Sequence, residues 1–305
     1  MRLDDFDPDI NVEDQRGQSF GGGGGGPGGL IFGLLPLIGS RFGCGGIVVV
    51  LIVLALFGGL GNIGGMLGGG IGSTPQVQTA PRAGAGGTGA TAACSVDASS
   101  RAACNAFSSA DKTWAALFAR SGEQFRQPKL VFYSGNGQSG CGAAQAAMGP
   151  FYCPSDQGIY LDTSFFQELQ DRFHAAGDFA QDYVIAHEFG HHIQTLLGTS
   201  DKVRQMQAQA NDTQGNALSV RLELQADCYA GVWAAQNRAR LDPGDIDEGL
   251  TAAHAIGDDT LQKEAQGRVV PDSFTHGTSA QRQAWLKRGV DSGDPAACDT
   301  FSGAI

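Results

Sequence analysis

The sequence has little of what marks several common protein classes. It contains no Cys-X-X-Cys pair, which argues against a structural zinc ribbon and thioredoxin-like redox chemistry. Charged residues make up only 17% of the chain, no basic cluster stands out, and the net charge is −11. Proteins that bind nucleic acid usually carry a basic patch that meets the phosphate backbone. We therefore expect no nucleic-acid partner.

Two regions of different composition follow one another along the 305 residues. Of the 47 glycines, 27 fall in the first 90 residues and 20 in the remaining 215. The first 90 residues hold 4 Lys/Arg and 6 Asp/Glu, which leaves 16 and 25 downstream and a net charge of −9 there. Because 42% of the chain is hydrophobic, a sizeable core is possible. We expect that core in the second region.

The N-terminal region predicts a membrane anchor. Residues 1–41 are polar and then glycine-rich, a composition that buries little apolar surface, so we expect a disordered cytoplasmic tail with a juxtamembrane segment. Residues 42–72 carry no charge and exceed the roughly 20 residues that a membrane-spanning helix needs, which predicts a single transmembrane segment. Residues 73–92 are expected to form a flexible linker, and residues 93–305 the folded domain. A cleaved signal peptide is the alternative interpretation of the apolar run.

The basic residues predict the orientation of this segment. Arg2, Arg16 and Arg41 precede it and only Arg82 follows closely, so the positive-inside rule places the N-terminus in the cytoplasm. We therefore expect a single-pass membrane protein whose C-terminal domain lies outside the cytoplasm.

Cysteine usage agrees with an extracytoplasmic domain. Apart from Cys44, six cysteines fall in the predicted domain, and we pair neighbours in the sequence as disulfides of an oxidising compartment. The alternative is a set of free buried thiols in a cytosolic protein. The predicted pairs are Cys94–Cys104, Cys141–Cys153 and Cys228–Cys298.

Hydrophobic periodicity predicts a mostly helical α+β domain with a small sheet. We expect strands at 129–134 and 158–162, joined by a long glycine-rich connection, and a helix that begins at Asp178 and ends before Gly198. The other predicted helices cover 94–120 with a break near Ser108, 217–240, 246–256 and 279–288.

The helix after Asp178 carries the strongest chemical motif. Residues 187–191 read His-Glu-Phe-Gly-His, so His187 and His191 are four residues apart on one helical face and can reach one metal ion. Glu188 lies beside the position that the metal leaves open, where it can take a proton from a zinc-bound water. The pattern predicts a zinc hydrolase.

A catalytic zinc ion needs a third protein ligand. The metzincin extension would require glycine at 194 and histidine at 197, but the chain has Gln194 and Leu197. We instead predict Glu223 as the third ligand, on a helix rich in buried residue types. Asp227, four residues later on the same face, can hydrogen-bond the far nitrogen of a ligand histidine. The alternative for Glu223 and Asp227 is a solvated helix face.

The remaining histidines carry weaker signals. His192 points away from the ligand face and is expected to pack or to support the site, while His174 and His254 belong to no motif. His276 lies on a predicted loop before a helix and, with Arg282 following it, could donate to the oxyanion of a tetrahedral intermediate. An ordinary surface loop is the alternative for His276.

Several of these segments together resemble a bacterial family of neutral zinc metallopeptidases. The segments are HEFGHHIQ (187–194), ELQADCYAG (223–231), IGDD (256–259) and SFTHGTSAQR (273–282), behind a glycine-rich tail and an apolar run. The resemblance implies a zincin-like domain with Zn²⁺ bound by His187, His191 and Glu223, and Glu188 as the base. The segment around His276 is also similar to one that follows the third ligand in integral-membrane zinc proteases.

The sequence and this resemblance thus predict a membrane-anchored zinc metallopeptidase, a single-pass protein of the bacterial inner membrane whose C-terminal domain is periplasmic or extracellular. Its substrates would be proteins or peptides, bound along a strand edge near residues 158–162. A catalytically silent membrane-anchored scaffold is one alternative, although a pure binding protein has no use for Glu188. A zinc hydrolase of non-peptide amides is another.

Overall fold

The computed structural model describes residues 1–18 and 88–305. The predicted transmembrane segment at 42–72 and most of the predicted linker lie outside these residues. Across the part of the chain that the structure describes, no helix combines the length and apolarity that a membrane crossing requires.

A four-stranded sheet forms one layer of the domain, in the order β1-β2-β6-β5. The strands β1 (Val12–Asp14), β2 (Lys129–Tyr133) and β6 (Gly158–Asp162) run parallel, and β5 (Phe151–Cys153) pairs antiparallel with β6 at one edge. A separate hairpin consists of β3 (Asn136–Ser139) and β4 (Gly142–Gln145). The two predicted strands are thus confirmed as β2 and β6, and β6 is an inner strand whereas β5 is an edge.

The alternation of side chains along β2 and β6 divides the core in two. Leu130 and Phe132 of β2, with Ile159 of β6, belong to the large cluster shared with the helices. Val131 and Tyr160, on the opposite face, join a smaller cluster that includes Ala144 of β4. The sheet is therefore covered on both faces.

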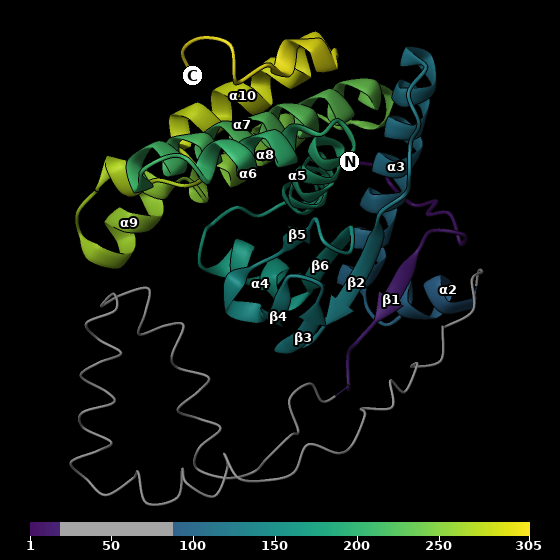
Figure 1. Ribbon diagram of the computed structural model, residues 1–305. Helices are drawn as coiled ribbons and strands as arrows, with labels where there is room; N and C mark the ends of the chain where they lie inside the picture. The colour runs from purple at the N-terminus through teal and green to yellow at the C-terminus, as the bar shows by residue number, and fades with distance from the viewer. Residues whose placement is uncertain (19–87) are drawn as a thin grey trace, which may run out of the picture. The chain divides into compact units, whose positions relative to one another are not determined.

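Helices form the rest of the domain, with α10, α7 and α8 in the upper layer of Figure 1 and α3 along one side of the sheet. The central helix α5 packs against α3, α7 and α8, and α10 packs against α7 and α8. The helices are α2 (Thr88–Cys94), α3 (Ala98–Ser121), α4 (Ser164–Asp171), α5 (Asp178–Leu196), α6 (Thr199–Gln207), α7 (Asp212–Gln236), α8 (Asp245–Ala255), α9 (Asp258–Gln266) and α10 (Ser279–Ser292). The mostly helical α+β class is confirmed.

The first 18 residues differ from the prediction of a disordered tail. Strand β1 pairs with β2 in the register Val12↔Leu130, and Met1 and Ile10 are buried in the core shared with the helices. Residues 1–18 and 88–305 belong to one compact unit. Because paired strands share one compartment, a cytoplasmic N-terminus separated from the domain by one membrane crossing does not fit this fold. The prediction of a disordered segment was wrong for residues 1–18.

Other sequence predictions fare differently. All three predicted disulfides are present, Cys94–Cys104, Cys141–Cys153 and Cys228–Cys298. Helix α3 continues without the predicted break, because Ser108 and Ser109 are buried within it and Ser109 accepts a hydrogen bond from the Trp233 indole. The helix with the histidine motif begins and ends as predicted, and Gly198 after it adopts a φ of 72°.

Candidate metal centre

The site forms where α5 and α7 cross. Gly190, inside the His-Glu-X-X-His motif, makes this approach possible, because a Cβ atom there would lie 3.0 Å from the backbone of Ala226. The close crossing brings the predicted ligand helix α7 against the histidine-bearing face of α5. The motif thus supplies the histidine ligands, and the glycine within it permits the close approach of the partner helix.

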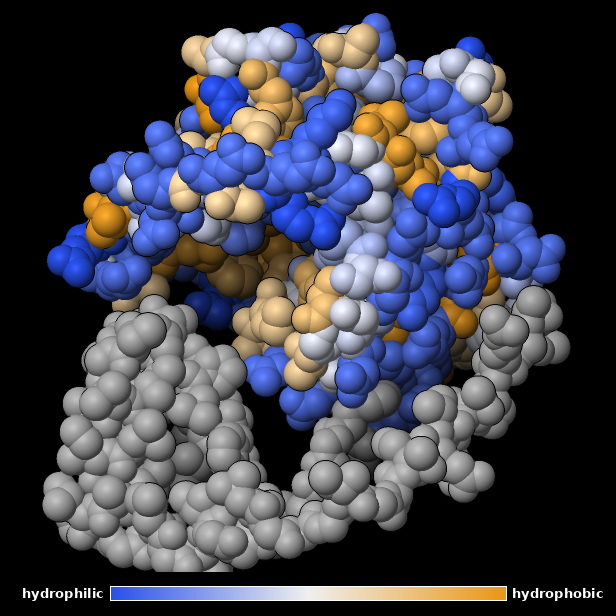
Figure 2. Space-filling model, viewed as in Figure 1, coloured by the Kyte–Doolittle hydropathy of each residue, from blue (hydrophilic) through white to orange (hydrophobic). Residues whose placement is uncertain are grey.

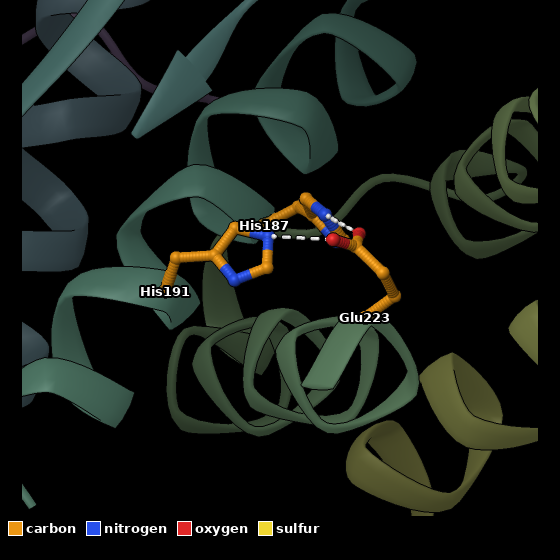
Figure 3. Close-up of side chains that lie close together, drawn as sticks. All are labelled: His187, His191 and Glu223. Atoms are coloured by element: carbon orange, nitrogen blue, oxygen red, sulfur yellow. Dashed lines mark hydrogen bonds and ion pairs between the residues drawn. The ribbon is translucent and has the colours of Figure 1, made fainter. Parts of the chain in front are cut away.

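Three predicted ligands converge at this crossing. Nε2 of His187 lies 3.1 Å from Oε2 of Glu223, and Nε2 of His191 lies 3.5 Å from Oε1 of the same carboxylate. Figure 3 shows both rings directed at the Glu223 carboxylate. One ligand atom from each of the three residues lies within 4.8 Å of the others.

The far nitrogens of both rings are held by acceptors. Nδ1 of His187 lies 2.8 Å from Oδ1 of Asp227, and Nδ1 of His191 lies 2.9 Å from Oε1 of Gln194. Because both partner oxygens only accept, each Nδ1 donates a proton, and Nε2 is the atom directed toward Glu223. This is the arrangement in which metal-binding histidines are oriented by outer partners. The predicted role of Asp227 matches its position.

The charges of the site are complementary to a cation. Burial alone lowers the pKa of His187, but Asp227 and Glu223 outweigh this effect and raise it to about 10. Burial likewise opposes the raised pKa of His191, which Glu223 causes. Burial raises the pKa of the Glu223 carboxyl, yet the two histidines hold it well below its usual value. Without a metal ion, a proton on His187 thus compensates part of the buried carboxylate charge.

This donor set fits zinc. Two imidazole nitrogens and one carboxylate are a known ligand set of catalytic zinc, which keeps a fourth position open. The outer hydrogen bonds to Asp227 and Gln194 supply the orientation that such ligands need. We conclude that His187, His191 and Glu223 can hold a zinc ion together.

The three residues open into a cavity of about 740 Å³. Glu188 lines the same cavity and is buried, so it shares the space that a substrate would enter. Apolar side chains from α4, α9 and the region of β5 form much of the wall, among them Phe165, Leu261 and Tyr152. Figure 2 shows a hollow with hydrophobic colours between the upper helical layer and the lower sheet layer.

His276 also lines this cavity, in agreement with its predicted position near the site. Asp258 organises its loop, since Oδ2 accepts from the backbone amides of Thr275, His276 and Gly277. Nδ1 of His276 lies 3.4 Å from Oδ1 of Asp258, and this carboxylate raises the pKa of the imidazole. His276 therefore lines the cleft with Asp258 against its ring, whereas its predicted role toward an oxyanion stays a prediction.

His192 is separated from the ligand set. Its Nε2 donates to the carbonyl of Arg126 at 2.7 Å, and its Nδ1 accepts from the Tyr152 hydroxyl at 3.1 Å. Burial lowers its pKa to about 4, so the ring is neutral. These contacts agree with the predicted packing role.

Sequence reasoning did not predict the supporting roles of three residues, Gln194, Tyr183 and Arg282. The first two occupy α5 at the spacings i+3 from His191 and i−4 from His187, and this same-face spacing was the available signal. Arg282 follows His276 by six residues, but nothing in the sequence indicates that its Nε donates to Oδ2 of Asp227 at 2.9 Å.

Comparisons with known proteins show which family this sequence matches. The family described as "Putative neutral zinc metallopeptidase" matches residues 1–301. "Uncharacterized protein YpfJ" of Escherichia coli K12 is 46% identical over 298 residues, which cover 97% of this chain and 96% of that protein. "Uncharacterized protein Mb2605" of Mycobacterium bovis is 44% identical over 210 residues, or 64% of this chain and 68% of that protein. No solved structure shows a significant match.

Proposed function

The chain belongs to the neutral zinc metallopeptidase family, and on this premise we propose that it is a membrane-anchored zinc-dependent peptidase. One observation carries the proposal. His187, His191 and Glu223 converge at one wall of a large cleft, and Glu188 lines that same cleft.

The chemistry follows from the positions of these side chains. Zinc bound by the two histidines and Glu223 would supply a Lewis acid that lowers the pKa of water and polarises a substrate carbonyl. Glu188 acts as the general base, accepting a proton from water and passing it to the leaving amine. His276, which lines the same cleft, donates toward the oxygen on which negative charge develops.

The sheet suggests how a peptide substrate lies in the cleft. The expected edge near 158–162 is β6, which is flanked by β2 and β5 and has no free edge. Strand β5 is the edge strand next to β6, and Phe151 and Tyr152 on it line the cleft. We place an extended substrate segment along β5, where backbone hydrogen bonds can hold it irrespective of most side chains.

We further propose that the domain acts outside the cytoplasm while anchored to the membrane. Three disulfides suit an oxidising compartment, and the uncharged run at 42–72 is long enough to enter a bilayer.

The decisive experiment compares the full-length protein with its Glu188→Gln variant. We expect close to one zinc per chain in both, cleavage of members of a peptide library by the wild type, and loss of cleavage in the variant by at least 100-fold, at the low end for a general base. Glu264→Gln, an exposed change on α9, is the matched control and should cleave normally. Equal turnover by Glu188→Gln would refute the mechanism.

A further inference from the structure

Arg282 is a charged side chain buried at the centre of the domain. It comes from the first turn of α10 and is only 2% exposed. A buried guanidinium is costly unless its donors are paired, so its position calls for specific partners. None of the proposed catalytic steps uses it.

Its partners lead directly to the metal centre. Nε donates to Oδ2 of Asp227 at 2.9 Å, and Nη2 donates to Oδ1 at 2.9 Å, which makes a bidentate pair. Nη1 donates to the carbonyl of Ile256 at 3.2 Å, and Nη2 also reaches the Tyr183 hydroxyl at 3.2 Å. The guanidinium is thereby fixed from three sides.

Asp227 is the shared acceptor of this cluster. Its Oδ1 accepts from the Tyr183 hydroxyl at 2.6 Å and from Nδ1 of His187 at 2.8 Å, in addition to Arg282. The Asp227 side chain is completely buried, so it cannot turn to solvent. Its orientation is therefore set by Arg282 and Tyr183, and it passes that orientation to His187.

The fold places α10 closely enough for this contact. A Cβ atom at Gly289 of α10 would lie 2.0 Å from the carbonyl oxygen of Cys228, and one at Gly231 of α7 would lie 2.2 Å from that of Leu286. A capping box between Thr278 and Gln281 fixes the start of α10 just before Arg282. Two glycine contacts and one cap thus determine where the guanidinium lies.

We propose that Arg282 is a positioning residue for the metal centre, which clamps the Asp227 carboxylate so that it holds His187 with Nε2 directed at Glu223. The expected consequence of this positioning is tighter zinc binding, and that part of the inference rests on the proposed function. Arginine suits the role because its planar fork engages both carboxylate oxygens at once, whereas lysine offers a single point charge.

The test uses full-length protein and the variants Arg282→Met, Arg282→Lys and Tyr183→Phe. Arg221→Met is the matched control, since Arg221 is a partly buried arginine on α7 that donates to the carbonyls of Thr300 and Gly303. Zinc affinity is measured by chelator competition, and the site geometry by the absorption spectrum of Co²⁺. The ring proton on Nδ1 of His187 is followed by nuclear magnetic resonance in the metal-free protein.

We expect Arg282→Met to bind zinc about 10- to 100-fold more weakly, as is typical when an outer partner is lost. Its Co²⁺ spectrum and its Nδ1 proton signal should change, Arg282→Lys should recover part of both, and Arg221→Met should match the wild type. If Arg282→Met does not fold, Arg282→Lys and Tyr183→Phe decide by the same measurements.

The outcomes separate this inference from the proposed function. Lower thermal stability with unchanged zinc affinity, Co²⁺ spectrum and Nδ1 proton signal would show a merely structural role and overturn the inference. A wild type that binds no zinc would overturn the proposed function, and the Nδ1 proton signal would still decide whether Arg282 positions His187.

Discussion

At the scale of single residues, the site balances buried negative charge with protons that a metal ion can replace. Glu223 and Asp227 are both ionised within the domain, since the pKa of Asp227 is lowered to about 2 despite burial, by Arg282 and His187. Their charge raises the pKa of His187 to about 10 against the effect of burial. Metal binding and proton release are therefore coupled.

Zinc uptake near pH 8 should accordingly release protons. His187 is protonated there in the metal-free protein, and its Nε2 must lose that proton to bind zinc. Calorimetric titration in buffers of different ionisation enthalpy measures the number released, and we expect at least about one per chain. A binding heat that does not depend on the buffer would contradict this expectation.

The same shift predicts how the stability of the metal-free protein depends on pH. A pKa raised by folding gives a stabilisation that is fully present below the unfolded-state value of about 6.5 and lost as the pH rises through about 10. The free energy of unfolding, measured with denaturant, should therefore fall over this range in the metal-free protein. A rise would show that His187 is neutral there.

A pair of substitutions distinguishes the third ligand from a neighbouring packing residue. Glu223→Ala should lose zinc readily, because it removes the carboxylate shared by both ligand histidines. His192→Ala should keep zinc while lowering thermal stability, because its nitrogens contact Arg126 and Tyr152. Metal content after dialysis measures the difference, and the reverse order would show that Glu223 is not a ligand.

At the scale of elements, close helix packing decides whether the ligands meet. Gly190 lets α5 approach α7, and Gly231 with Gly289 lets α7 approach α10. Each contact is against backbone, which cannot move aside as a flexible side chain can. These three glycines thus link the helix with the histidines to the helices that carry Glu223 and Arg282.

Gly289→Ala should therefore destabilise the domain by about 1–3 kcal/mol or more, the usual cost of overpacking, and weaken zinc binding by displacing Arg282. Gly215→Ala on α7 is the matched control, because a Cβ there meets no atom within 4 Å. It should be neutral or stabilising by about 0.5–1 kcal/mol, as alanine favours helix. Thermal unfolding and chelator competition compare the two, and equal effects would contradict the packing argument.

The elements also show where local patterns succeed. Strands β2 and β6 and helix α5 have long apolar patterns with clear ends, and each forms close to its predicted bounds. The serines at 108 and 109 gave a false signal, because hydrogen bonds and burial against α7 outweigh their preference for helix ends. Strand β1 could not be predicted, because its three residues are too few for a periodic pattern and its extended form depends on pairing with β2.

At the scale of the whole molecule, the N-terminal segment and the domain form one body. Asn105 donates to the carbonyl of Leu3 at 2.5 Å, Arg16 donates to the carbonyl of Ala93 at 2.9 Å, and β1 is paired with β2. These contacts require residues 1–18 and 88–305 to share a compartment. The positive-inside rule could not anticipate this, since it considers charges near a span and not the folding of the segments beyond it.

Cysteine labelling tests this arrangement. With Cys44 replaced by serine, single cysteines at exposed Asp9 and at exposed Glu264 of α9 should react equally with a membrane-impermeant maleimide in spheroplasts. Permeabilised cells give the full extent of labelling at both positions. Protection of one position and not the other would show that the two parts lie on opposite sides of the membrane.

The sequence by itself determined the local spacing of the candidate ligands. The spacing within His187–His191 and the glutamate and aspartate of α7 follow helical geometry, so the ligand candidates and the outer partner Asp227 could be named without coordinates. The disulfide pairs could be predicted because four of the cysteines form two pairs that are close in the sequence, which leaves Cys228 and Cys298 for each other. All three predicted disulfides are present.

Only the tertiary structure decided what comes together from distant segments. The parallel pairing of β1, the edge position of β5 and the clamp of Arg282 on Asp227 all join residues whose separation in sequence carries no periodic signal. Their contacts depend on backbone approach and on the pairing of buried polar groups, which act through space and leave no pattern along the chain.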